Sequence, residues 1–191
     1  NLLGIRGRIF AVEEKWGDAE TAFRKAIEIE PNNIDIYQPL LLTYQGQNKT
    51  AEARALVKDL NENLPDNAQA LILLAEFYHD QGELEKVEET LNRVVDVAPE
   101  QEQYRIILAD FYIKMGRSEE AQKVLIEAQQ SLESSTAIDI MLATLFFERQ
   151  EFEQSKALLG KVVTEQPDNK EARLLQARFL MQEGKLRESI E

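Results

Sequence analysis

The stretch PNNIDIYQPLLLTYQGQNKTAEARALVKDLNENLP, from Pro31 to Pro65, decides the fold of this 191-residue chain. Pro65 follows Pro31 by 34 residues. Pro99 lies a further 34 residues along the chain, and Pro167 another 68. Four of the five prolines therefore lie on one lattice of period 34, which predicts an array of equal structural units.

Apolar residues recur at the same places in each unit when the lattice proline is numbered position 32. Small residues recur at positions 8 and 20, as in Ala75 and Ala121, and large apolar residues at positions 11 and 24, as in Tyr112 and Leu125. Helices approach closely where side chains are small, and large neighbours fill the space alongside. Each unit is therefore predicted to be a pair of closely packed helices.

The helical period of apolar residues (i, i+3, i+4, i+7) gives the expected bounds of these helices. First helices are expected over residues 34–45, 68–81, 102–115, 136–149 and 170–183. Second helices are expected over residues 49–61, 84–97, 118–132 and 152–165.

Turn and cap residues mark the ends of the expected helices. The turns carry Gly82, Gly116 and Gly184, which tolerate a left-handed backbone after a helix end. Asp168 with Glu171 predicts a capping box at the start of the expected helix over residues 170–183. The lattice prolines end second helices, and where Glu133 replaces one, Ser134 and Ser135 are available as caps.

Pro39 is the one proline off the lattice and lies inside an expected first helix. It predicts a kink there, because proline has no backbone N–H. Two interpretations remain open: a tolerated bend near the first turn, or a functional hinge.

These features resemble the tetratricopeptide repeat, whose signature W-x2-L-G-x2-Y, A-x3-F and P has period 34. One unit carries it in Leu74, Ala75, Tyr78, Gly82 and Leu91, followed by Pro99. The leading tryptophan is replaced in every unit, by Leu3, Tyr37, Leu71, Arg105, Asp139 and Arg173. The resemblance covers nearly the whole chain and is closest to bacterial proteins of this family.

The resemblance implies an all-α fold, a right-handed α-solenoid (superhelix) of antiparallel helix pairs with about five and a half repeats. We expect one array over residues 1–191, with units at 1–33, 34–67, 68–101, 102–135, 136–169 and an incomplete 170–191. The last unit is expected to stop within its second helix, at Ser189-Ile190-Glu191.

Composition excludes several classes of function. A net charge of -13 repels phosphate backbones and anionic membrane surfaces, and no apolar run approaches the roughly 18 residues of a membrane span. Without cysteine there are no thiolate metal sites or thiol nucleophiles. The single histidine, His79, has no nucleophile at a recognisable spacing, so it is interpreted as a polar side chain on a helix face. We therefore predict no catalytic, cofactor or metal site.

The resemblance also implies that first helices line a concave face, with positions 2, 5, 6, 9, 12 and 13 toward a ligand. Carried over to this chain, the candidate partner-binding residues are Ile72, Leu73, Glu76, His79, Asp80, Ile106, Ile107, Asp110, Ile113, Ile140, Met141, Thr144, Phe147, Leu175 and Arg178. Positions 5 and 6 have a second interpretation, as packing between adjacent first helices. Chaperone-binding members of the family hold the C-terminal carboxylate of a partner with Lys and Asn residues at positions 2, 5, 6 and 9. In this chain those positions hold mostly Ile, Leu, Gln and acidic residues, so no such carboxylate clamp is predicted.

The predicted function is a non-catalytic scaffold that binds a protein or peptide along an apolar groove with an acidic patch. The preferred ligand carries basic residues near Glu76 and Asp110. An alternative is a structural spacer or self-assembly module whose exposed repeat ends stack on further repeats or on another copy. A third is an accessory region of an enzyme. The compartment stays open between the bacterial cytoplasm and the periplasm or envelope.

Overall fold

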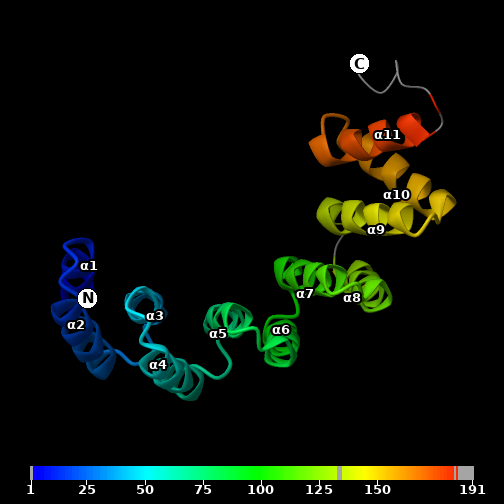
Figure 1. Ribbon diagram of the computed structural model, residues 1–191. Helices are drawn as coiled ribbons and strands as arrows, with labels where there is room; N and C mark the ends of the chain where they lie inside the picture. Colours follow the sequence, from blue (N-terminus) through cyan, green and yellow to red (C-terminus); the bar gives the residue numbers. More distant parts are fainter. Residues whose placement is uncertain (1, 133–134, 183, 185–191) are drawn as a thin grey trace. The chain divides into compact units, whose positions relative to one another are not determined.

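The computed structural model describes residues 2–132, 135–182 and 184, and over these ranges the chain forms eleven α-helices and no strand. The helices fall into two compact units, Asn1–Ala98 (unit 1) and Pro99–Glu191 (unit 2). In Figure 1 unit 1 holds helices α1 to α6 and unit 2 holds α7 to α11. The all-helical fold is confirmed.

Each unit is a series of helix pairs in chain order. Unit 1 contains α1 (Leu2–Val12), α2 (Trp16–Ile29), α3 (Ile34–Gly46), α4 (Thr50–Asn63), α5 (Ala68–Asp80) and α6 (Leu84–Val97). Unit 2 contains α7 (Glu102–Lys114), α8 (Ser118–Ser131), α9 (Thr136–Glu148), α10 (Phe152–Glu165) and α11 (Lys170–Gln182). Within a unit every helix packs against the next one along the chain. The described bounds of the expected helices agree with the structure to within two residues. The expected end at Glu183 and the second helix at Ser189 lie outside the described residues.

The turn inside each pair places one residue in the left-handed region. Six such residues lie 34 apart, with φ between 56° and 75°: Glu14, Asn48, Gly82, Gly116, Gln150 and Gly184. Around Gly82, the Glu83 N–H donates to the Tyr78 carbonyl and the Gly82 N–H to the His79 carbonyl, both at 2.9 Å. These bonds satisfy carbonyls left open at the helix end. The glycine prediction is confirmed, and three turns adopt the same conformation without glycine.

Four first helices, α3, α5, α9 and α11, begin with a capping side chain two residues after lattice position 32, whereas Gln101 before α7 forms no such bond. The Asn67 Oδ1 accepts from the Ala70 N–H at 2.9 Å, and the Ser135 Oγ accepts from the Ile138 N–H at 3.3 Å, as predicted for Ser135. The capping box at Asp168 is wrong. Since α11 begins at Lys170, its cap is Asn169, whose Oδ1 accepts from the Ala172 N–H at 3.1 Å. Glu133 and Ser134 lie outside the described residues.

Pro39 lies within α3, which continues through it from Ile34 to Gly46. Because proline has no N–H, the carbonyl of Asp35 one turn earlier lacks its helical donor. Arg8 of α1 supplies a replacement: its Nη2 donates to the Asp35 carbonyl at 3.0 Å. A neighbouring helix thus satisfies the group that the proline leaves open. The kink stays a prediction.

Small and large residues pack together at positions 8 and 24. A Cβ added to Gly7 would lie 2.6 Å from the ring of Phe23, which is completely buried. In unit 2 the same two positions hold Ala143 and Leu159, both in one buried cluster. Glycine at position 8 therefore occurs with phenylalanine at position 24, and the larger alanine occurs with the smaller leucine. In both cases the two helices of the pair are in contact.

Candidate functional site

We define the first-helix face of a unit as positions 5, 6, 9, 12 and 13 of its first helices. In unit 1 the chemistry of this face is mixed: Leu42 of α3 is 60% exposed, whereas α5 presents polar side chains. Glu76, His79 and Asp80 of α5 are exposed, and the Gln45 Nε2 of α3 donates to Asp80 Oδ2 at 3.2 Å. Of the two predicted apolar contacts on α5, Ile72 is half-buried and Leu73 is buried.

In unit 2 the first-helix face contains a hollow of about 580 Å³, called here the α9 hollow. It is lined by Ile106, Ile113, Ser118, Ala137, Ile140, Met141, Thr144, Leu145, Glu148 and Glu171. Ile106, Ile113, Met141 and Thr144 are half-buried, so part of each side chain faces the hollow. The structure thus brings five predicted site residues together, with Ile140 as the fifth.

The other predicted residues of unit 2 lie beside the hollow or in the core. Ile107 is 39% exposed, whereas Leu175 is buried in the cluster that also contains Ile140. Phe147 packs edge-on against Phe179 with ring centroids 4.7 Å apart. Core packing, the second interpretation of positions 5 and 6, therefore describes Leu73, Ile140 and Leu175, and not Ile106 or Ile107.

Ion pairs engage several charges on this face. Lys114 Nζ lies 2.6 Å from Asp110 Oδ2, and Arg178 pairs with Glu148. The Arg178 guanidinium also stacks over the ring of Phe147, with Cζ 4.4 Å from its centroid. The charged residues that line the α9 hollow are both carboxylates, Glu148 and Glu171.

Two apolar residues on α11 were not among the fifteen predicted. Leu174 is 65% exposed and Met181 is 56% exposed. They occupy lattice positions 5 and 12, the same positions at which Ile106 and Ile113 were predicted to face a ligand. The sequence could therefore have identified them in the same way.

Unit 2 also contains a buried carboxylate. Asp139 of α9 is 1% exposed, and it accepts from Lys161 Nζ of α10 at 2.7 Å and from Gln129 Nε2 of α8 at 2.6 Å. The hydrogen bond to Asp139 raises the pKa of Lys161 above its usual value. Asp139 occupies the tryptophan position of the repeat signature, and its role is to join three helices.

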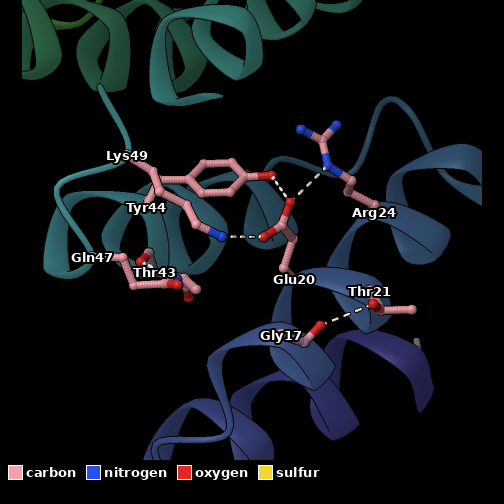
Figure 2. Close-up of polar contacts among 8 residues, drawn as sticks. All are labelled: Gly17, Glu20, Thr21, Arg24, Thr43, Tyr44, Gln47 and Lys49. Atoms are coloured by element: carbon pink, nitrogen blue, oxygen red, sulfur yellow. Dashed lines mark hydrogen bonds and ion pairs between the residues drawn. The ribbon is translucent and has the colours of Figure 1, made fainter. Parts of the chain in front are cut away.

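Unit 1 has a counterpart at Glu20, shown in Figure 2. Its carboxylate accepts from the Tyr44 hydroxyl at 3.0 Å and from Lys49 Nζ at 2.9 Å, and Arg24 Nε lies 3.5 Å away. Burial alone would raise the pKa of Glu20, but the hydrogen bonds from Lys49 and Tyr44 outweigh it and lower that pKa. Burial and the bond to Glu20 raise the pKa of Tyr44 to about 12. This cluster connects α2 to α3 and to the start of α4.

The described ranges contain no group of three His, Cys, Asp or Glu side chains arranged to hold a metal ion. Among the helices in the part of the chain that the structure describes, none has the length and apolar character needed to cross a membrane.

Comparison with known families matches models described as tetratricopeptide repeat over residues 13–70 and 44–109, 103–131 and 140–191. The chain belongs to the tetratricopeptide repeat family. Proteins of this family generally mediate protein–protein interaction through stacked helix pairs. A search of curated proteins gave no match.

Solved structures of the same fold are similar across most of the chain. A tetratricopeptide repeat protein from Parabacteroides merdae is 21% identical with a TM-score of 0.64, covering 98% of this chain and 75% of the other. PilF from Pseudomonas aeruginosa is 17% identical with a TM-score of 0.63, covering 98% and 85%. A chain of the APC/C hetero-tetramer Cut9–Hcn1 is 14% identical with a TM-score of 0.60, covering 92% and 33%. At these identities the likeness concerns the fold.

Proposed function

We propose that the chain is a non-catalytic scaffold that holds a segment of a partner protein in the α9 hollow of unit 2. The observation that carries this proposal is the hollow itself, whose floor exposes parts of Ile106, Ile113 and Met141. Accessible apolar side chains gathered in one concavity mark sites where partners bind. Family membership supports the class of function, since one similar structure is part of a hetero-tetramer.

The partner segment is an amphipathic helix or an extended apolar stretch. Its apolar side chains contact Ile106, Ile113 and Met141, and methionine adapts its shape to different partners. Because both charged residues in the lining are carboxylates, Glu148 and Glu171, a segment that carries basic residues is favoured. The acidic residues of unit 1, Glu76 and Asp80, are outside this binding site in the proposal.

A matched pair of substitutions tests the proposal. Ile113 and His79 share lattice position 12, one in the hollow of unit 2 and one exposed on α5 of unit 1. Affinity purification with Ile113→Asp should lose the partners that the unaltered chain retains, and His79→Asp should keep them. Circular dichroism checks that both variants fold. Equal retention of partners by both variants would rule out the hollow as the binding site.

Phe147 is a poorer choice for this experiment. It packs against Phe179 and Phe152, with centroid distances of 4.7 and 5.7 Å, so a charge there would disturb the core of unit 2.

A further inference from the structure

A second hollow of unit 2, called here the polar hollow, adjoins the α9 hollow. It has a volume of about 420 Å³ and shares Ala137, Ile140 and Glu171 with the α9 hollow. The rest of its lining is polar and includes Glu102, Ser135, Thr136, Gln166 and Asn169. The two hollows therefore form one surface along α9, apolar towards the end of this helix and polar at its start.

The carboxylates along this surface are not equivalent. Glu148, in the α9 hollow, is paired with Arg178. Glu102 and Glu171 are exposed, and neither pairs with a cation among the residues that the structure describes. No lysine or arginine is among the described residues that line either hollow. Negative charge without a counter-charge is therefore concentrated in the polar hollow.

The polar hollow lies at the starts of α9 and α11, and helix starts commonly bind anions. Here their first N–H groups are already engaged. The Ile138 N–H donates to Ser135 Oγ at 3.3 Å, and the Ala172 N–H donates to Asn169 Oδ1 at 3.1 Å. A helix start also supplies only about half a unit of positive charge, whereas a carboxylate contributes a full negative one. The polar hollow consequently favours a cationic group over an anionic one.

The α9 hollow contains two hydroxyl groups among its apolar side chains, those of Ser118 and Thr144. Thr21, Thr43 and Thr164, which also lie in helices, each donate to the carbonyl four residues earlier. Over the described ranges the hydroxyls of Ser118 and Thr144 form no hydrogen bond, and both residues are half-buried. These two hydroxyls are therefore available to a ligand.

The free hydroxyls bear on the conformation of the bound segment. An α-helix satisfies its own backbone N–H and C=O groups. An extended segment does not, and it needs partners for them where it lies against a protein surface. Helix α9 has 13 residues. Its length of about 20 Å is spanned by about six extended residues at roughly 3.3 Å each. Both features favour an extended segment over a helix.

We propose that the two hollows together bind an extended segment of a partner protein with the pattern apolar-x-apolar-x-basic. Alternate side chains of an extended segment face the same side, so the two apolar side chains enter the α9 hollow and the Lys or Arg enters the polar hollow. The backbone of the segment bonds the hydroxyls of Ser118 and Thr144. This arrangement rests on the proposed function, since it requires that the α9 hollow binds a partner. The pattern holds in either chain direction, because the hollows position side chains.

The test uses capped nine-residue peptides with Ile at positions 3 and 5, Lys at position 7 and Ser or Thr elsewhere, too short to form a stable helix. In fluorescence polarisation with the full chain, this peptide or its reversed sequence should bind at least about tenfold tighter than the version with Glu in place of Lys. It should also bind at least about tenfold tighter than a 21-residue helical peptide that carries the same three side chains on one face, because a helix cannot bond the two hydroxyls.

Substitutions in the chain test each part of the site. Glu102→Gln combined with Glu171→Gln should weaken binding of the Lys peptide about fivefold or more. Glu76→Gln with Asp80→Asn removes the same charge from α5 and should leave the affinity unchanged. Thr144→Val keeps the shape of the side chain without the hydroxyl, and it should weaken binding about fivefold. Circular dichroism checks that the variants fold.

Chemical coupling locates the lysine directly. A carbodiimide joins a lysine amine to a carboxylate in contact with it, as an amide, with loss of water. Mass spectrometry should find the peptide attached to Glu102 or Glu171. Attachment to Glu148 would place the basic residue at the wrong end of the surface and overturn the proposal.

Other results would also overturn it: equal binding of the Lys and Glu peptides, tighter binding of the helical peptide, or no binding of any peptide at about 1 mM. Ile113→Asp separates this failure from that of the proposed function. If Ile113→Asp abolishes peptide binding and the variant Glu102→Gln, Glu171→Gln does not weaken it, the α9 hollow binds partners but the polar hollow takes no basic residue. If Ile113→Asp retains the partners of the unaltered chain, the α9 hollow itself is excluded.

Discussion

The two units carry different chemistry at the same lattice positions of their first helices. At position 12 unit 1 has Gln45 and His79, whereas unit 2 has Ile113 and Phe147. The small and large residues at positions 8 and 24 keep their complementary sizes in both, as Gly7 with Phe23 and Ala143 with Leu159 show. Stacking therefore depends on one set of positions and surface chemistry on another, so the face can change without loss of the fold.

The units also differ in the carboxylate that joins their helices. Glu20 in unit 1 and Asp139 in unit 2 each accept hydrogen bonds from two other helical segments. The Glu20 side chain is 23% exposed, whereas that of Asp139 is 1% exposed. Water can occupy the place of the part-exposed Glu20 carboxylate, whereas loss of the buried Asp139 carboxylate leaves a cavity between three helices. Equivalent bonds should therefore contribute unequally to stability.

The largest expected effect comes from removing the buried carboxylate. Asp139→Ala should lower the free energy of unfolding of unit 2 by about 3 kcal/mol, because it removes the hydrogen bonds that a buried carboxylate accepts from α8 and α10 and leaves a cavity in its place. Glu20→Ala should lower that of unit 1 by only about 1 kcal/mol. Hydrogen exchange of the α9 and α10 amides measures the first, and urea unfolding followed by Trp16 fluorescence measures the second. Equal losses would contradict the role assigned to burial.

The size complementarity at positions 8 and 24 predicts the next effect. Gly7→Ala should destabilise unit 1 by about 2 kcal/mol, since the new Cβ would lie 2.6 Å from the Phe23 ring. Adding Phe23→Leu recreates the pairing found at Ala143 and Leu159 and should recover part of the loss. Urea unfolding followed by Trp16 fluorescence gives both values. Gly17→Ala, at a helical site with open space, is the control and should not destabilise. A double variant less stable than Gly7→Ala would refute the complementarity.

Turn residues should respond with opposite signs within unit 2. Gln150→Gly should raise the free energy of unfolding by about 1 kcal/mol, because glutamine at φ 62° is strained and glycine is not. Gly116→Ala, at φ 71°, should lower it by about the same amount. Hydrogen exchange of the neighbouring helices measures both. Changes of the same sign would show that the left-handed backbone is not the cause.

The smallest effect is a pH dependence confined to unit 1. Because the pKa of Glu20 is lowered in the folded state, its stabilising contribution is fully present well above the ordinary value of 4.5. It declines as the pH falls below 4.5 and disappears once the pH passes below the folded pKa. The difference in urea midpoint between the unaltered chain and Glu20→Gln should therefore shrink between pH 7 and pH 3. A constant difference would exclude the ionised Glu20 as its source.

The sequence predicted the helices well because their boundaries are local. Residues at 34-residue intervals repeat the same turn, and proline and glycine act on the backbone within a few residues. The failure at Asp168 has a related cause. Asp168 and Asn169 are both good caps, and a shift of one residue decides which of them accepts from the helix.

The candidate site was less predictable, since chemical identity does not determine accessibility. Leu73 and Ile107 share lattice position 6 and are both aliphatic, yet Leu73 is buried and Ile107 is 39% exposed. Their burial depends on the neighbouring elements, and a position number contains no information about these. The α9 hollow could therefore be proposed from the sequence only as one of two interpretations.

By itself the sequence determined the repeat, the alternation of first and second helices and the left-handed turns at Gly82, Gly116 and Gly184, because each depends on side chains that are close together in the chain. Only the tertiary structure decided that the ring of Phe23 excludes a side chain at Gly7, that Arg8 satisfies the carbonyl left open by Pro39, and that Lys161 neutralises Asp139. These contacts join different helices, and their geometry depends on how the helices stack, which no local period encodes.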